Sequence, residues 1–220
     1  MKFNSKITKE EVNQLEPVEF EGEVVLIDKK EKLPMAIYEL NMQDSVGIDT
    51  ETRPSFSRGV YYNVSLLQIS TDNKCYLFRL NKIGFPKELL DFLSNSRIRK
   101  IGLSLHDDFL SLRKRGKINP ANFIDIQNIV KDYGILELSL QKIYAVIFNK
   151  KISKSQRLSN WERDALTKQQ IKYAATDAWA CLKIYHQLQT EKKISKKELK
   201  ELESLQLQPL AKPYQTADAG

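Results

Sequence analysis

Hydrophobic and polar positions alternate along the first half of the chain in a way that predicts a series of short strands. Apolar and polar residues alternate over residues 20–27, with β-branched residues at the centre, which predicts a strand. A turn leads from it to a short helix expected at residues 32–42. Asp72 and Asn73 supply a hairpin turn. The pattern predicts three antiparallel strands and then a parallel crossover, with the strands at residues 46–49, 62–70, 75–80, 98–103 and 122–125.

Helices are predicted between the later strands and through most of the second half. The pattern is helical after Pro86, and residues 107–114 form a further predicted helix. The longest helix is expected to begin at Thr167, because Gln170 stands three positions later in capping-box spacing, and to end near Leu188. The mixture of strands and helices indicates an α/β fold.

The pattern divides the chain into one domain with two extensions. Residues 20–190 are predicted to form the domain, and 41% hydrophobic residues in a chain of 220 suffice for one core. Residues 1–19 are expected to be an N-terminal extension. Residues 191–220 begin as a Lys- and Glu-rich run and end without an apolar pattern, which is typical of a charged, partly disordered tail.

The chain is moderately basic, with 35 Lys and Arg against 28 Asp and Glu and a formal net charge of +7. This excess favours a polyanionic partner such as nucleic acid, although many soluble proteins share it. No run approaches the ~20 apolar residues of a membrane span, and the charged start lacks the apolar segment of a secretory signal. We therefore expect a cytoplasmic protein without membrane association.

Cysteine and histidine are too few to support several classes of site. Cys75 and Cys181 lie far apart and have no CxxC spacing, which argues against a disulfide framework or a zinc site. His106 and His186 are the only histidines, so a His-rich metal site or a Ser-His-Asp hydrolase is not favoured. Any catalytic site is expected to depend on other residue types.

Two acids stand at the end of the strand predicted at residues 46–49. Asp49 and Glu51 come directly after the apolar Val46-Gly47-Ile48, and side chains two positions apart share one face of a strand. Two ionised acids at close range repel each other and lose hydration unless a cation lies between them. The pair therefore indicates a metal site, although a turn or a helix cap would also account for it.

Further acids occur in similar settings later in the chain. Asp177 stands among alanines in the longest predicted helix, and Tyr173 lies one turn before it on the same face. A buried salt bridge with a lysine is the alternative role of Asp177. Asp107 and Asp108 open a predicted helix, where the helix dipole alone favours acids. Taken together, these acids suggest metal-dependent hydrolysis of phosphodiesters.

At these positions the sequence resembles the DEDD superfamily of 3′-to-5′ exonucleases, in its ribonuclease D and Werner-syndrome exonuclease branch. The first motif of that family, Asp-x-Glu, falls on Asp49 and Glu51. The second motif, an aspartate after Lys-x-Gly, falls on Asp108, and the third, Tyr-x-x-x-Asp, falls on Tyr173 and Asp177. The resemblance spans about residues 20–188.

Further details of the sequence indicate which aspartate, which subclass and which branch of the family the chain resembles. Counting from Lys100-x-Gly102 selects Asp108 rather than its neighbour Asp107, and Lys172 stands where a related branch carries a catalytic histidine, which supports the tyrosine subclass. The segments that look closest to the Werner-type exonucleases are residues 57–59, 67–69, 75–78, 155–161 and 173–178.

The resemblance implies both a fold and a reaction. The fold is a ribonuclease H-like (DnaQ-like) α/β domain, a mixed sheet with helices on both faces. The reaction is removal of nucleotides from a free 3′ end, with DNA favoured over RNA, to release nucleoside 5′-monophosphates. The cofactors implied are two divalent ions, Mg²⁺ or Mn²⁺, which suit oxygen ligands.

The family's residue roles carry over to the matched positions. Asp49 would bridge both ions, Glu51 and Asp177 would complete the nucleophile side, and Asp108 would serve the leaving-group side. Tyr173 would orient the attacking water, since a phenol with an ordinary pKa near ~10 is a weak base.

The nucleic-acid contacts and the rival functions rest on weaker signals. Arg53 and Arg58 follow the first motif, beside Tyr61 and Tyr62, and could contact phosphates and stack on bases, whereas Arg157 precedes the last helix. Each of the three arginines could instead be an ordinary solvated or ion-paired residue. Lys100 could also contact a phosphate of the nucleic-acid backbone, although charged residues are common at strand ends. The rival functions are a ribonuclease D-like RNA exonuclease, a nucleic-acid-binding module with a dead site, and a hydrolase of small nucleotides.

Overall fold

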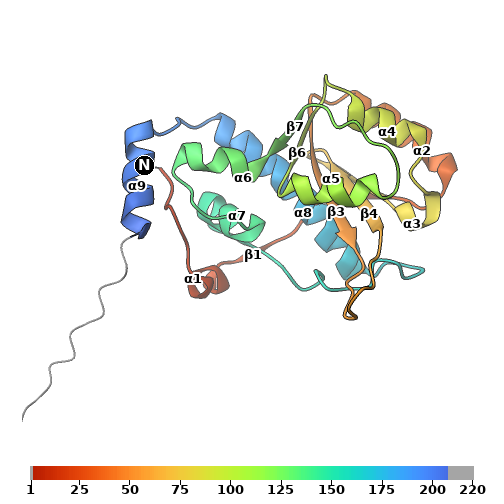
Figure 1. Cartoon of the computed structure of the whole chain (residues 1–220), viewed down its shortest axis with the longest axis horizontal. Helices are drawn as coiled ribbons and strands as arrows, with labels where there is room; N and C mark the ends of the chain where they lie inside the picture. Colours follow the sequence, from red (N-terminus) through yellow and green to blue (C-terminus); the bar gives the residue numbers. More distant parts are fainter. Residues whose placement is uncertain (1, 208–220) are drawn as a thin grey trace, which may run out of the picture.

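A six-stranded mixed sheet forms the centre of the molecule, as Figure 1 shows for the computed structural model, which describes residues 2–207. The strands follow the order β2-β5-β4-β3-β6-β7. As predicted, β3, β4 and β5 are antiparallel neighbours, and β6 and β7 continue the sheet in parallel beside β3. Strand β2 lies at the other edge of the sheet, parallel to β5. The bounds are β2 (Glu23–Ile27), β3 (Ser45–Thr52), β4 (Val64–Ser70), β5 (Lys74–Phe78), β6 (Arg99–Gly102) and β7 (Phe123–Asp125).

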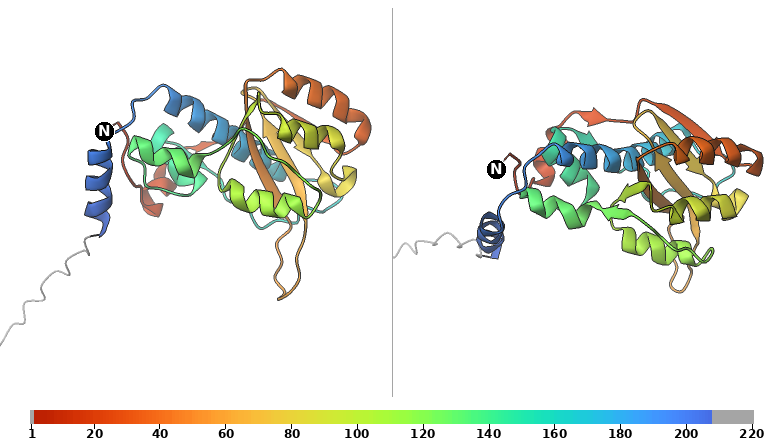
Figure 2. Two further views of the ribbon diagram at one scale, coloured as in Figure 1. Left: turned by 45° about the horizontal axis from the view of Figure 1, so that its top comes forward. Right: turned by 90° about the horizontal axis from the view of Figure 1, so that it is seen from above.

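Helices cover both faces of this sheet (Figure 2). The long helix α8 (Lys168–Gln189) lies on one face and α7 (Leu140–Phe148) packs against it. Three helices share a core with β3 on the other face: α2 (Leu33–Asn41), α4 (Lys87–Ser94) and α5 (Leu105–Arg113). This arrangement confirms the predicted fold class. The remaining helices are α1 (Lys9–Gln14), η1 (Lys30–Lys32), α3 (Leu80–Ile83), α6 (Ile126–Ile129), η2 (Val130–Tyr133) and α9 (Lys196–Leu207).

The central strand β3 sends alternate side chains to the two helical layers. Val46 and Ile48 are buried in the core that α2, α4 and α5 share. Gly47 points the other way, where a Cβ atom would lie 1.9 Å from the carbonyl oxygen of Ala178 in α8. Only glycine leaves room for the helix backbone there, so α8 lies directly on β3. The next residues on the Gly47 face are Asp49 and Glu51.

The start of α8 is fixed by the predicted capping box. The backbone N–H of Gln170 donates to Thr167 Oγ1, and the backbone N–H of Thr167 donates to Gln170 Oε1, with N···O distances of 3.1 and 3.0 Å. The alanines of the next turns, Ala174, Ala175 and Ala178, are fully buried and let the helix approach the sheet. Asp177 is thereby carried to the sheet surface within a well-anchored helix.

The sequence missed a small second sheet that ties the N-terminal segment to the rest. Strands β1 (Pro17–Val18) and β8 (Lys151–Ile152) pair in parallel, and two-residue strands are too short to show a period in sequence. The N–H of Ile7 also donates to the Glu137 carboxylate at 2.9 Å. The predicted boundaries at residues 19 and 190 stay predictions. Part of the predicted tail forms α9, and residues 208–220 lie outside the described residues.

Several predicted boundaries were wrong by a few residues. Strand β3 continues to Thr52 because Asp49–Thr52 pair with β4, and Leu80 begins α3 instead of ending β5. Helix α5 begins at Leu105, since the N–H groups of Ser104 and Leu105 both donate to the Asp125 carboxylate. Among residues 2–207 no helix has the length and apolarity needed to cross a membrane.

Candidate active site

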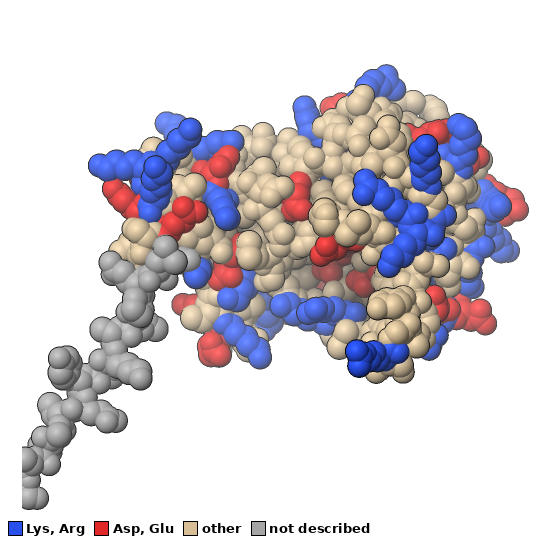
Figure 3. All heavy atoms as spheres, in the orientation of Figure 1, with Lys and Arg blue, Asp and Glu red and all other residues tan. Residues whose placement is uncertain are grey.

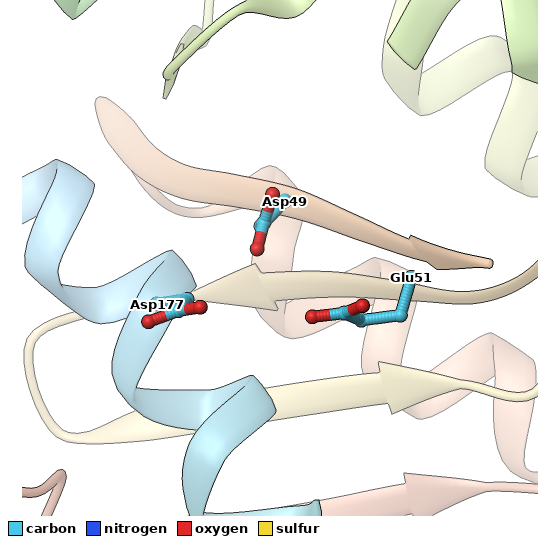
Figure 4. A group of neighbouring side chains, drawn as sticks. All are labelled: Asp49, Glu51 and Asp177. Carbon is cyan, nitrogen blue, oxygen red and sulfur yellow. The ribbon is translucent and has the colours of Figure 1, made fainter. Parts of the chain in front are cut away.

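Three carboxylates converge where β3 meets α8. Asp49 and Glu51 extend from one face of β3, and Asp177 extends toward them from the helix that lies on this face (Figure 4). Each residue places one carboxylate oxygen within 4.8 Å of the corresponding oxygens of the other two. The close contact of α8 with Gly47 is what brings groups so distant in sequence to this spacing.

The surroundings of these acids disfavour their ionised forms. Burial raises the pKa of Asp49 well above its usual range, and the charges of Asp108 and Asp177 raise it further. Burial and the neighbouring acids together raise the pKa of Glu51 to about 10. Burial also raises the pKa of Asp177 to about 7, although Tyr173 and Lys154 oppose this effect. Without a cation, the cluster would therefore hold protons near neutral pH.

Asp108 approaches the cluster from the opposite side of the sheet. It stands in the first turn of α5, and Thr50 Oγ1, which belongs to the other face of β3, donates a hydrogen bond to its carboxylate. Burial raises the pKa of Asp108 to about 7. Its charge acts on Asp49, yet its oxygens lie outside the group of three that share the 4.8 Å spacing. The structure thus brings three of the four acids into one cluster and places Asp108 next to it.

The sheet has an opening that admits this fourth acid. Strand β6 pairs with β3 only through Ser45, Val46 and Gly47, so the rest of β3 extends beyond the end of β6. The chain leaves β6 at Gly102 and turns through Ser104, which has a positive φ of 59°, into α5. Ligands of α/β proteins commonly bind at such carboxyl ends of neighbouring parallel strands.

Tyr173 borders the cluster one turn before Asp177. Its ring packs on the buried Trp161, with a centroid distance of 6.1 Å. Burial raises the pKa of the Tyr173 hydroxyl well above its ordinary value, and the charges of Asp177 and Glu51 act in the same direction. This phenol therefore stays protonated and can donate a hydrogen bond at any physiological pH.

Two cations face the acids from the segment before α8. Lys154 lowers the pKa of Asp177, and Arg157 lowers that of Glu51, so both lie close enough to act on the cluster. Both side chains are exposed. In Figure 3, Lys and Arg side chains border the hollow in which acidic atoms are visible.

The other two predicted nucleic-acid residues lie in the loop between β3 and β4. Arg53 is half-buried, with its guanidinium 4.6 Å from the centroid of the Tyr62 ring and 3.5 Å from the Glu162 carboxylate. Arg58 is exposed farther along this loop, which protrudes from the molecule (Figure 2). Phe56 and Tyr61 in the same loop are 85% and 84% exposed. The roles of Arg53, Arg58 and Arg157 stay predictions.

The four acids suit a hard divalent cation. Their oxygens form no ion pair with a lysine or arginine within residues 2–207. Carboxylate oxygens without sulfur or imidazole ligands match Mg²⁺ or Mn²⁺ rather than zinc or copper. A bound cation would favour their ionised forms, against the burial that raises all four pKa values and the repulsion that adds to it at Asp49 and Glu51. The donor set of this structure therefore fits a divalent metal.

Sequence reasoning missed the nearness of Lys154 to Asp177, because no motif covers an exposed lysine in an irregular segment. It also offered Lys100 as a phosphate contact, and the structure shows this to be wrong. The Lys100 side chain is fully buried, and its ammonium donates to the carbonyl oxygens of Asn95 and Ile98. A signal was available in the strand period, since Lys100 stands two positions after the apolar Ile98 and so shares its face.

A family described as 3′-5′ exonuclease matches residues 24–193, which include all four acids and Tyr173. Among curated relatives, the mouse bifunctional 3′-5′ exonuclease/ATP-dependent helicase WRN is 30% identical over 181 residues, or 78% of this chain and 13% of that protein. An Arabidopsis thaliana 3′-5′ exonuclease is 32% identical over 146 residues, or 64% of this chain and 51% of that one. The chain thus spans from an eighth to half of these relatives.

Solved structures share the fold at lower identity. The Nibbler EXO domain of Aedes aegypti superposes with a TM-score of 0.68 at 22% identity, over 81% of this chain and 94% of that one. Escherichia coli RNase D, an exoribonuclease involved in structured RNA processing, gives a TM-score of 0.69 at 20% identity, over 84% and 49% of the two chains.

Proposed function

The chain belongs to the 3′-5′ exonuclease family, and we propose that it removes nucleotides one at a time from the 3′ end of a nucleic acid and releases nucleoside 5′-monophosphates. One observation carries the proposal. Asp49, Glu51 and Asp177 each place a carboxylate oxygen within 4.8 Å of those of the other two, beside the protonated hydroxyl of Tyr173. This arrangement offers ligands for metal and an orienting group for water at one place.

The acids would hold two divalent ions, Mg²⁺ or Mn²⁺. Asp49, Glu51 and Asp177 would form one set of ligands, and Asp108 would serve the second position. When bound, such ions activate water and stabilise charge on the phosphoryl and leaving oxygens. Thr50 holds the Asp108 carboxylate by a hydrogen bond and so fixes its orientation.

Tyr173 would position the attacking water. Its hydroxyl stays protonated, so it acts as a hydrogen-bonding group and not as a base. The packing of its ring on the fully buried Trp161 restrains its direction. Precise aim matters because in-line attack at phosphorus tolerates little misplacement.

Arg157 and Lys154 would neutralise the substrate phosphates at the mouth of the site. Both cations are exposed and act electrostatically on the acids. An exposed cation that faces a buried acidic cluster can turn toward a phosphate when a strand arrives. Arg53 and Arg58 would contact the strand from the β3–β4 loop.

DNA is the favoured substrate of this proposal, because the segments at residues 57–59, 67–69 and 155–161 resemble the Werner-type exonucleases. RNA is the alternative. One of the structural neighbours, RNase D of Trypanosoma brucei, was solved in complex with an RNA, at a TM-score of 0.69 and 19% identity. The test therefore has to include both polymers.

The test uses a 5′-labelled DNA duplex with a recessed 3′ end and a matched RNA strand, each incubated with Mg²⁺ or Mn²⁺. The variant Asp177→Asn serves as the matched control, because it keeps the shape of the side chain and removes its charge. We expect a ladder that shortens from the 3′ end of DNA, and we expect the variant to produce none. A ladder on RNA alone would move the substrate to RNA.

Two other outcomes would replace the proposal. Binding of both polymers without cleavage would indicate a binding module with a dead site. Cleavage of nucleotide-sized compounds alone, with little dependence on salt, would indicate a hydrolase of small nucleotides, since binding to a polymer through its phosphates weakens steeply as salt rises.

A further inference from the structure

A lysine-lined hollow lies beside the active site, between α1, α7 and β8. Its volume is about 460 Å³. Four of its nine lining residues are lysines, and no acid is among them. The lysines come from three separate parts of the chain: Lys9 from α1, Lys142 from α7, and Lys151 and Lys154 from β8 and the residues after it.

This concentration of one charge sign is not a general property of the surface. A hollow next to α9 is lined by Lys2, Lys192 and Lys193, but Glu191 and Glu198 line it as well. Opposite charges placed together neutralise each other, whereas lysines without acids create a positive potential that attracts an anion. The hollow at α1 is therefore suited to an anion in a way that the hollow at α9 is not.

The lysines of the hollow keep much of their charge available. Lys9 and Lys154 form no ion pair with the residues that the structure describes, and both are exposed. Lys151 donates to the backbone oxygen of Asn13 at 2.6 Å, which leaves its charge uncompensated. Lys142 pairs with Glu137 at 3.1 Å and contributes less.

The hollow shares lining residues with a second one that reaches Tyr173 of the active site. Lys154 belongs to its lining and also acts on Asp177. This second, smaller hollow shares Ile152 and Ser153 with it and is lined by Tyr173 and Lys168 as well. It also contains Lys172 and Glu19, which pair with each other at 3.7 Å. Figure 3 shows basic side chains in a row from the region of α1 along the edge of the acidic hollow.

We propose that this hollow is a track for the sugar–phosphate backbone of the substrate strand, several nucleotides away from the 3′ end that is being cut. The proposal rests on the proposed function and adds a binding surface to it. Lysines are point charges that bind phosphates without reading bases, and no aromatic side chain lines the hollow. The track would therefore hold any sequence.

The N-terminal segment gives this track a character of its own. Lys9, Val12 and Asn13 form one wall, and the family match begins only at residue 24. The β1–β8 pairing and the hydrogen bond from Lys151 to Asn13 hold α1 beside β8. Lys9, which lies outside the matched residues, would thus add to the hold that Lys142, Lys151 and Lys154 have on a long strand.

The test compares binding and hydrolysis of strands of different length. Lys9→Glu is suitable, because Lys9 is the first residue of α1 and acids are favoured in the first turn of a helix. The stronger variant is Lys9→Glu/Lys142→Gln, and these two are the groove variants. The control matched to the double variant, Lys29→Gln/Lys30→Glu, makes the same charge change as that variant on exposed lysines that precede α2 and line neither hollow.

Binding of a labelled single-stranded DNA of about 20 nucleotides is measured in EDTA over a range of salt, and hydrolysis of a dinucleotide is measured with Mn²⁺. We expect the groove variants to bind the long strand about 3- to 10-fold more weakly at low salt. The slope of log affinity against log salt should become shallower by about 0.7 for each phosphate that the variant no longer neutralises. Dinucleotide hydrolysis should be unchanged.

Each contrary outcome has a distinct meaning. Equal weakening by the groove variants and by the control would overturn the track, because net charge alone would then explain the effect. Unchanged binding in the groove variants would overturn it as well. Absence of hydrolysis of every substrate by the unmodified protein would instead refute the proposed function, and the binding measurement in EDTA would still decide whether the track exists.

Discussion

The two ends of strand β3 both lie beside charge that is withdrawn from water, and the charge is handled in opposite ways. At one end Asp49 and Glu51 meet Asp177, and each acid is a near neighbour of another acid. At the other end Val46 pairs in register with Lys100 of β6, whose side chain is fully buried.

The buried lysine is satisfied by the fold. Its ammonium donates to two backbone carbonyls and lies over the rings of Phe92 and Phe123, 5.8 and 5.1 Å from their centroids. Burial lowers the pKa of Lys100 to about 8, so this placement is still unfavourable for the charge. Arg79, also buried, donates to the backbone oxygens of Arg163 and Asp164.

The acids are not satisfied by the fold. Burial raises the pKa of all three members of the cluster, and repulsion by neighbouring acids raises those of Asp49 and Glu51 further. No lysine or arginine pairs with them in residues 2–207. The difference separates two uses of buried charge. A charge whose partners are built in serves structure, and a charge whose partner has to come from outside serves a ligand.

The largest expected effect is the loss of catalysis with a gain in stability. Asp177→Ala should lower turnover by on the order of 10⁴-fold, because the metal site loses a ligand. The same change should raise the melting temperature of the metal-free protein at pH 8, since it removes a repelling charge. Gel-based exonuclease assays and calorimetry measure the two effects. A variant that retained turnover would refute the metal assignment.

The next effect tests the neighbour of the acids. Tyr173→Phe should slow turnover roughly 10²-fold, because the attacking water loses a hydrogen-bonding partner. Metal affinity should be unchanged, since the ring and all four acids remain. Single-turnover kinetics and titration of Mn²⁺ measure these two quantities. Equal turnover in the variant and the unmodified protein would remove Tyr173 from the mechanism.

A dependence on pH should distinguish the metal-free protein from the loaded one. The unfolded chain ionises its carboxyl groups near pH ~4, whereas the folded chain retains protons on Asp108 and Asp177 to about pH 7 and on Glu51 to about 10. The folded state binds more protons in this interval, so the free energy of unfolding falls as the pH rises.

In EDTA the melting temperature should therefore fall by on the order of 10 °C between pH 5 and pH 9. Mg²⁺ or Mn²⁺ should restore most of the loss at the upper pH, because the cation relieves the repulsion. Thermal unfolding followed by circular dichroism measures both quantities. A melting temperature that rose with pH in EDTA would contradict the assignment of repelling acids.

The smallest expected effect concerns the lysine. Lys100→Met should lower the free energy of unfolding by about 1–3 kcal/mol, because the carbonyl oxygens of Asn95 and Ile98 lose their donor. Turnover below the melting transition should stay as it was. Urea unfolding measures the free energy of unfolding, and the exonuclease assay measures turnover. A large loss of turnover without a loss of stability would undo the distinction between the two ends of β3.

The sequence was most informative where a local rule acts. The capping box of Thr167 and Gln170 and the antiparallel unit of β3, β4 and β5 were predicted correctly, because a cap and a turn are set by neighbouring residues. The structure also brings Asp49, Glu51 and Asp177 together, as the resemblance to the exonuclease family implied.

The missed features depend on contacts between distant segments. The sequence shows a glycine at position 47, but not that the backbone of Ala178 occupies the space of its missing side chain. It shows Lys100 and Lys154 as two lysines, and only the packing turns one into the interior and leaves the other beside Asp177. The hollow at α1 was equally invisible, since its lysines come from three separate segments.

The separation of the acids along the chain also bears on how the protein is made. Asp49 and Glu51 leave the ribosome first of the four acids, Asp108 follows, and Asp177 emerges last. Until α8 docks on β3 at Gly47, the acids are hydrated, separate and without a shared ligand. The candidate metal site is therefore complete only after α8 has docked on β3.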